Sequence, residues 1–265
     1  MIVDNLWEDI DTFQRKIGQY PELKIKIIMA SDKTEYHEII GRSSPIIEFS
    51  QAVYIPSRAT ILLQNPRDMK NFSRLREIIL HEYIHHFVHA QIKNPPLWFN
   101  EGMAVYYSGG LTYRRELNFI KNYLLGNSQS LNQMRRRYPQ NRIEWESFYA
   151  NSALAVKYLA TEKAQRFQKF WQNLQTEREF SAAFIRSFYF TPSEFSYFFE
   201  QYSQDNFRLG LLLSSSGLIW ALLPLIFLLA LLRRSIKNRR IRKRWQEYEA
   251  RQADLEKSEE KNNEG

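Results

Sequence analysis

The apolar positions in the N-terminal part of the chain follow two different periods. Over residues 3–17 they recur at helical spacing, which predicts an amphipathic helix. Over residues 23–29 they alternate, with Ile25, Ile27 and Met29 on one side, which predicts a half-buried strand. Two further strands are predicted at 50–55 and 59–63, joined as a hairpin. This part is therefore predicted to be a small sheet with helices.

The pattern becomes helical after this sheet. One helix is predicted over 71–92, and a second over 95–107 follows the break at 93–96, with Asn94 as its N-cap and Pro95 at its first position. Residues 114–203 are predicted to be almost wholly helical. The breaks in that region are expected near 126–127, at Pro139 and at 191–192.

One stretch of the chain is far more apolar than the rest. Residues 209–232 carry no charge, and 18 of these 24 residues are apolar. As a helix the stretch reaches roughly 36 Å, which exceeds the bilayer's hydrocarbon core of about 30 Å. We therefore predict a transmembrane helix at 209–232 between a domain at 1–208 and a charged tail at 233–265. A buried core helix is the alternative.

Charge predicts the orientation of this helix. The chain has 37 Lys and Arg against 29 Asp and Glu, a net charge of +8, and eight of the cations lie within 233–244. The positive-inside rule then predicts a single-pass protein of the cell membrane, in contact with the lipid bilayer, with domain 1–208 extracytoplasmic and the C-terminus cytoplasmic. Because this topology explains the basic charge, we predict no nucleic-acid partner.

The start of the chain conflicts with that orientation. Residues 1–20 lack the apolar run of a signal peptide. Either a leader is missing from the given start or has been removed, or the protein is tail-anchored with its main domain in the cytosol. The oligomeric state is left open by the sequence.

Composition and histidine placement point to a metal site. The chain is 44% hydrophobic, which is enough for a core and excludes a wholly disordered protein. It has no cysteine, so disulfides and thiolate metal sites are excluded. Four of its five histidines lie within the nine residues 81–89. Such crowding indicates a bound metal ion.

Two of these histidines have the spacing of metal ligands. His81, Glu82 and His85 form an H-E-x-x-H motif. On a helix the two imidazoles lie about 40° apart on one face, so both can bind one ion. Glu82 lies about 100° round from His81, where it can act as general base on a water bound to that ion. His86 and His89 are predicted to be supporting or surface residues rather than ligands.

The apolar face of this helix argues against an incidental cluster. Ile78, Val88 and Ile92 share the face of the two histidines. A solvated, histidine-rich surface helix would have polar neighbours at those positions. The sequence therefore predicts that the site is packed inward, where water is restricted.

Helix length locates a third ligand. From His85 to the break near Ile92 the chain rises about 10.5 Å, and an antiparallel helix from Pro95 returns about 9 Å to Glu101. Glu101 thus comes back level with the two histidines, and a zinc ion would keep its fourth position open. Gly102 follows it, and we expect that glycine where two helices approach closely.

These residues resemble the gluzincin metallopeptidases, specifically the bacterial thermolysin-like group. H-E-x-x-H is followed at 96–106 by P-L-W-F-N-E-G-M-A-V-Y, which is similar to that group's P-x-W-x-x-E-G-x-A-x-Y. The resemblance covers roughly 23–201, with a weaker Y-x-x-S match at 149–152. It implies an α+β fold in which a small N-terminal β-sheet packs on a mostly helical zincin-type domain, followed here by one C-terminal transmembrane helix.

The resemblance also implies a mechanism. His81, His85 and Glu101 would bind Zn²⁺, and Glu82 would be the general base in hydrolysis of a peptide or protein substrate. Thermolysin itself has an Asp four residues after the glutamate ligand, where this chain has Val105, so another residue must orient the histidines, and Asn100 is a candidate.

Other roles in the cleft are less constrained. The donor to the developing oxyanion is predicted to be Tyr149, with Tyr106 and Tyr113 as alternatives. The family's strand before the metal helix borders the cleft, so 59–63 is predicted to hold substrate by strand addition. The basic run 135–137 is taken as a solvated turn, with a preference for acidic substrates as the alternative.

The sequence thus predicts a membrane-tethered zinc metallopeptidase. Two alternatives stay open: an inactive gluzincin-like binding module that keeps the metal, and a membrane-anchored interaction protein whose histidine cluster is incidental.

Overall fold

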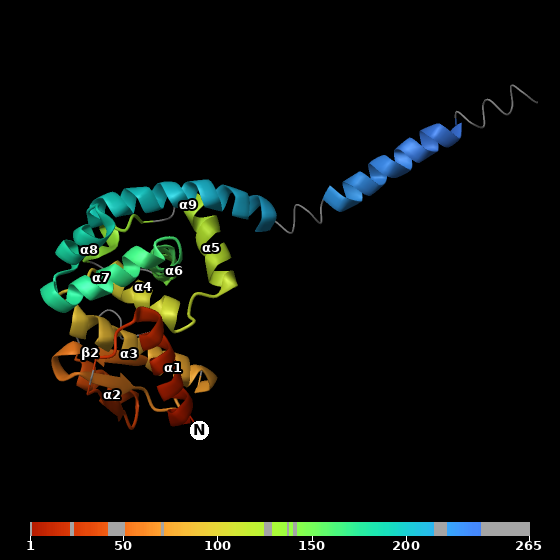
Figure 1. Cartoon of the computed structure of the whole chain (residues 1–265). Coiled ribbons are helices and arrows are strands. Elements are labelled where there is room, and N and C mark those ends of the chain that lie inside the picture. Colours follow the sequence, from red (N-terminus) through yellow and green to blue (C-terminus); the bar gives the residue numbers. More distant parts are fainter. Residues whose placement is uncertain are drawn as a thin grey trace, which may run out of the picture. The chain divides into compact units, whose positions relative to one another are not determined.

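The computed structural model is mostly helical, with one small sheet (Figure 1). It describes residues 2–21, 24–41, 51–69, 72–124, 129–136, 138–139, 142–214 and 222–239. The chain divides into two compact units, Met1–Leu211 and Leu212–Gly265. The first unit holds the sheet and all the residues of the predicted site.

The sheet has three strands in the order β1-β3-β2. β1 (Lys26–Met29) runs parallel to β3 (Thr60–Leu63), and β2 (Ala52–Ile55) runs antiparallel to it. The predicted hairpin is confirmed, with the short 3₁₀ helix η1 (Pro56–Arg58) as its turn. β3 is paired on both sides and wholly buried. β2 is therefore an edge strand.

The first predicted strand is only partly right. β1 begins at Lys26, and Leu23 lies outside the described residues. The face assigned to the interior is exposed, with Ile27 at 46% and Met29 at 50%. Ile28, on the opposite face, packs with Tyr36 instead. Ile25, just before β1, does pack on the main core, so the prediction fails only for Ile27 and Met29. Tyr36 belongs to a helix that the sequence pattern had not predicted.

That helix is α2 (Lys33–Ile40). Its N-cap Asp32 accepts a hydrogen bond from the Glu35 N–H at 2.9 Å, and Glu35 accepts one from the Ser31 N–H at 2.6 Å. The arrangement resembles a capping box, except that Glu35 bonds the N–H of the residue before the N-cap. The sequence carried this signal, an acidic residue three positions after an N-cap.

Three of the predicted helices are present, and the second and third of them carry the predicted site. α1 (Ile2–Ile17) and α3 (Leu75–Gln91) match the predicted helices, α3 being preceded by the short η2 (Phe72–Arg74). α4 (Leu97–Tyr107) starts two residues later than expected. Pro96 is its N-cap, and Asn94 has a left-handed φ of 52°, so the prediction of Asn94 as the N-cap is wrong. Asn adopts this conformation more readily than most residues.

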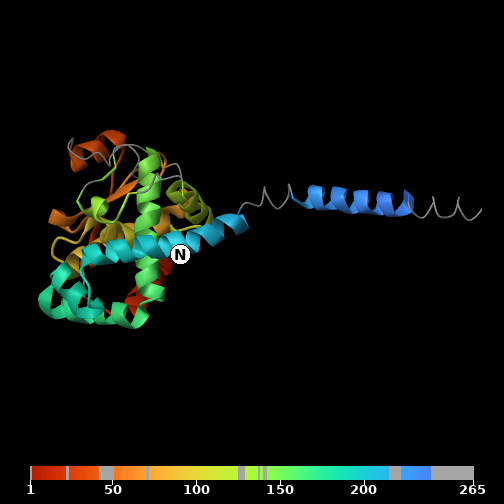
Figure 2. The same ribbon diagram turned by 90° about the horizontal axis from the view of Figure 1, so that it is seen from above.

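The described residues from 113 to 214 are mostly helical, as predicted for 114–203. The helices are α5 (Tyr113–Leu124), η3 (Gln133–Arg135), α6 (Arg142–Thr161), α7 (Ala164–Glu177), α8 (Phe180–Phe188) and α9 (Pro192–Ser214). The break at 191–192 is confirmed, and that at 126–127 lies outside the described residues. Figure 2 shows α9 crossing α6, and the two touch where Tyr158 packs on Phe195 and Phe199.

α3 and α4 lie at the centre of this unit. α3 packs on β2, β3, α1 and α4, and α4 packs most extensively on α6 (Figure 1). Gly102 allows the second contact, because a Cβ there would lie 2.3 Å from the Ser152 carbonyl oxygen. The expected close approach at Gly102 is thus confirmed, and the neighbouring helix is α6.

The predicted transmembrane helix at 209–232 is wrong for the described residues, none of whose helices is both long and apolar enough to cross a bilayer. α9 ends at Ser214, and 215–221 lie outside the described residues. The helix at 222–239 takes in cations, starting at Arg233 and Arg234. The predicted single-pass location in the cell membrane, with an outer domain 1–208 and a cytoplasmic tail, depended on that span and is contradicted with it.

Candidate metal centre

His81 and His85 lie one turn apart on the buried helix α3. Their Nε2 atoms are 3.2 Å apart. The side chains are 22% and 10% exposed, so one edge of the pair remains open to solvent. Val88 and the C-cap residue Ile92 are fully buried, as predicted for the inward face, whereas Ile78 is half-buried and lines the cleft described below.

Glu101 returns on α4 to the level of these histidines. Its Oε2 lies 3.8 Å from Nε2 of His81 and 3.6 Å from Nε2 of His85. With the 3.2 Å between the two nitrogens, these distances define a circle of about 2 Å radius through the three atoms. That radius equals the bond length of zinc to imidazole nitrogen or carboxylate oxygen. The three residues form a group that can hold a metal ion.

The two oxygens of Glu101 have different surroundings. Oε1 accepts a hydrogen bond of 2.7 Å from the Tyr138 hydroxyl. Oε2 is buried and has no hydrogen-bond partner among the described residues. A buried carboxylate oxygen is costly to leave unpaired, and this one faces two imidazole nitrogens. A cation between them would satisfy all three atoms.

Tyr138 was not foreseen from the sequence. Burial raises the pKa of its hydroxyl well above the usual range, and the negative charge of Glu101 acts in the same direction. The hydroxyl therefore stays protonated and donates to Glu101. The ring stacks on Trp145 at a centroid distance of 4.8 Å, which fixes its orientation.

Burial holds the pKa of His81 well below its usual range, and the charges of His85 and Arg115 lower it further. A hydrogen bond with the backbone of Ala104 acts in the opposite direction. The ring is thus neutral near pH 7, as metal binding requires.

The predicted role of Asn100 is not seen in the described hydrogen bonds. Asn100 is buried, yet its Oδ1 has no partner among the described residues, and the same holds for Nδ1 of His85. The His85 ring instead lies edge-on to the His81 ring, with the ring centroids 4.8 Å apart.

Glu82 lies beside the metal group without joining it. Its Oε2 accepts a 2.7 Å hydrogen bond from the Tyr54 N–H on edge strand β2. The pKa of Glu82 is raised to about 7, chiefly by burial; the charge of Glu101 acts in the same direction, while His85 and the hydrogen bond from Tyr54 oppose it. The side chain is 8% exposed and borders the cleft described below. A carboxyl with such a pKa can both accept and return a proton near neutrality.

A cleft of about 290 Å³ opens at the metal group. Its lining includes Ala52, His81, Glu82, Val105, Arg115 and Tyr149. The strand that borders it is β2. The prediction that 59–63 holds substrate is therefore wrong, because β3 already pairs with a strand on each side.

The three candidate tyrosines are placed differently. Tyr149 lines the cleft with His81 and Glu82, and burial raises the pKa of its hydroxyl well above the usual range, as do the charges of Glu101 and Glu82. Tyr106 instead packs on Tyr107, and Tyr113 is 71% exposed. Neither lines the cleft. Of the three, only Tyr149 lies at the site.

His86, His89 and Arg135 are not part of the metal group. Nδ1 of His86 is 2.9 Å from the Tyr54 hydroxyl, and the His89 ring lies 5.9 Å from the Tyr54 ring. Arg135 is exposed and does not line the cleft, while Arg137 lies outside the described residues.

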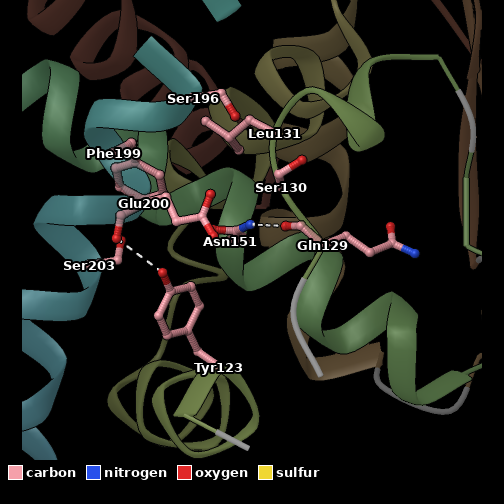
Figure 3. Close-up of a pocket in the computed structure, with 9 residues that line it drawn as sticks. All are labelled: Tyr123, Gln129, Ser130, Leu131, Asn151, Ser196, Phe199, Glu200 and Ser203. Atoms are coloured by element: carbon pink, nitrogen blue, oxygen red, sulfur yellow. Dashed lines mark hydrogen bonds between the residues drawn. The ribbon is translucent and has the colours of Figure 1, made fainter. Parts of the chain in front are cut away.

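A second cavity lies where α5, α6 and α9 meet (Figure 3). It measures about 20 Å³, space for one water molecule. Its polar walls are tied by hydrogen bonds from Asn151 to the Gln129 carbonyl oxygen at 2.8 Å and from the Tyr123 hydroxyl to the Glu200 carbonyl oxygen at 3.0 Å. None of the metal-group residues lines it, so it is separate from the candidate site.

Compared with models of known protein families and with curated proteins, the chain matches none of them. The case for a function therefore rests on the residues of the site.

Proposed function

We propose that the protein is a zinc metallopeptidase of the gluzincin type, with His81, His85 and Glu101 as metal ligands. The observation that supports this most is the circle of about 2 Å radius through their three donor atoms, one of them a buried and unpartnered carboxylate oxygen. Two imidazoles and one carboxylate, with an open side, are the ligand set of catalytic zinc in peptidases. The resemblance of the two sequence motifs favours the same assignment.

Zinc bound by these ligands would lower the pKa of a bound water to about 7 and polarise a substrate carbonyl. Glu82 is positioned to take a proton from the attacking water. The Tyr54 N–H holds its Oε2, which fixes the carboxylate beside the metal group and leaves Oε1 able to accept the proton. As the C–N bond breaks, Glu82 returns this proton to the leaving nitrogen. Water is consumed, and a carboxylate and an amine are released.

Tyr149 supplies the other polar group of the reaction. Its hydroxyl stays protonated and borders the cleft, so it can donate to the oxygen on which negative charge develops. Gln51 and Ala52, at the start of β2, line the same cleft, so an extended peptide bound there would lie beside this end of the strand. Both features fit a peptide substrate.

Glu82→Gln tests the catalytic role. We expect the variant of the full-length protein to bind zinc as the wild type does and to lose about 10²–10⁴-fold in cleavage rate on a denatured protein, because it lacks the general base. Glu77→Gln is the matched control, since Glu77 borders the same cleft but pairs with Arg74. A zinc-loaded wild type that is as inert as Glu82→Gln across a broad peptide library would favour a binding module. Absence of zinc from all the proteins would favour an interaction protein.

A further inference from the structure

Arg115 is the cation of the cleft that the proposed chemistry does not use. It belongs to the first turn of α5 and lines the same cleft as His81, Glu82 and Tyr149. Its side chain is exposed, but its Nη1 donates a 2.8 Å hydrogen bond to the Gly110 carbonyl oxygen. This contact holds one side of the guanidinium group and leaves the other donors available.

The loop that carries this carbonyl is itself fixed. The Gly110 N–H donates to the Val105 carbonyl oxygen at 2.9 Å, which ties the loop to the end of α4. A Cβ at Gly110 would lie 3.2 Å from that oxygen and 3.5 Å from Nη1 of Arg115. Glycine thus lets the loop and the guanidinium pack closely. Arg115 is positioned by backbone rather than by an acid.

Arg115 has no carboxylate partner among the described residues. The contrast is with Arg74, the other arginine of the cleft, whose Nη2 lies 2.6 Å from Oε2 of Glu77. The side chain at the adjacent wall is Val105, which offers no charge. A positioned guanidinium without an anion, at the mouth of a cleft, is suited to an anion brought by a ligand.

Arg115 shares this cleft with the reacting groups, because His81, Glu82 and Tyr149 line the same cavity of about 290 Å³.

We propose that Arg115 binds a carboxylate of the peptide substrate next to the scissile bond. The carboxylate is either the α-carboxylate of the substrate's C-terminus or the side chain of an acidic residue. This inference rests on the proposed peptidase function and adds the substrate class to it. Guanidinium binds carboxylate with paired, charge-assisted hydrogen bonds, which gives direction as well as affinity.

The test is the binding of labelled peptides to zinc-loaded, full-length Glu82→Gln protein, which does not consume them. Matched peptides end in a free carboxylate or an amide, and a second pair carries Glu or Gln at one internal position. We expect one carboxylate form to bind about 10- to 100-fold more tightly than its neutral partner. Tighter binding of the peptide with a free C-terminus identifies the α-carboxylate. Tighter binding of the peptide with an internal Glu identifies an acidic side chain.

Arg115→Gln should abolish this preference, and Arg115→Lys should restore only part of it, because lysine lacks the planar fork. Arg114→Gln is the matched control, since Arg114 is exposed in the same turn and does not line the cleft. Equal binding of all the peptides, or a preference that survives in Arg115→Gln, overturns the proposal. Cleavage by the wild type is scored separately, so a peptidase without carboxylate preference is distinguished from a protein that cleaves nothing.

Discussion

Gly102→Ala tests the packing that positions Glu101. A Cβ at this position would lie 2.3 Å from the Ser152 carbonyl oxygen and 2.8 Å from Cγ2 of Val156. Non-bonded heavy atoms ordinarily stay at least about 3.5 Å apart, so α4 and α6 must separate by about 1 Å. Overpacking of this kind costs about 1–3 kcal/mol and more where backbone must move, whereas alanine gains about 1 kcal/mol in helix propensity. We expect a net loss of about 2 kcal/mol in the free energy of unfolding.

The same shift should weaken metal binding. Glu101 precedes Gly102 on α4, and a displacement of about 1 Å is half of a zinc–ligand bond length. Urea unfolding in the presence of a chelator measures the packing cost without the stabilisation that bound metal adds. Zinc titration of the folded variant measures the second effect.

A second variant sharpens this test. Gly102→Ala combined with Val156→Ala removes one of the clashing groups but leaves the Ser152 backbone in place. Because Val156 is fully buried and its truncation is itself destabilising, the double variant is compared with Val156→Ala alone, relative to which it should remain destabilised. A single variant as stable as the wild type, or more stable, would refute the reasoning, because helix propensity would then outweigh the close contact.

Two further predictions concern groups outside the metal ligands. Tyr138→Phe removes the donor to Oε1 of Glu101 and should weaken zinc affinity about 10-fold, measured by competition with a chelating dye; unchanged affinity would show that this contact does not support the ligand. The Thr191 N–H donates to Glu194 at the start of α9, and this bond lowers the pKa of that carboxyl below its ordinary 4.5. The stabilisation is therefore present above pH 4.5 and is lost as the pH falls through the folded value. Glu194→Gln should lower the thermal midpoint at pH 7. The difference in midpoint between the variant and the wild type should become smaller in acid, and a constant difference across pH would contradict this.

The metal group could be predicted because its geometry is local. His81 and His85 share one helix face, and one short connection fixes where Glu101 returns. Helical rise alone therefore brought the three candidate ligands level, and the structure places their donor atoms within 4.8 Å of one another. Gly102 was also informative, because a glycine inside a helix usually has a packing reason.

Tyr138 and Arg115 could not be identified in this way. Tyr138 lies 37 residues from Glu101, in the connection before α6, and the chain has 15 tyrosines among which sequence does not choose. The importance of Arg115 depends on which carboxylates come near it in three dimensions. Such contacts follow from tertiary packing and leave no periodic trace in the sequence.

Two predictions were wrong because each used only the local sequence pattern of its segment. Strand 59–63 carries an apolar run, but only the pairing order reveals that it is central and that β2 forms the edge. The stretch 209–232 was judged by composition in a continuous window. In the described residues the helices do not follow that window, since one ends at Ser214 and the next extends beyond Arg233.

The most direct test of the account is the zinc content of the full-length protein after dialysis against zinc and removal of loosely bound metal. The account predicts about one zinc per chain in the wild type, and near-background zinc in His85→Ala and Glu101→Ala proteins that remain folded by circular dichroism. Wild-type protein that retains no zinc, or variants that retain as much as wild type, would contradict the assignment of His81, His85 and Glu101 as the metal centre.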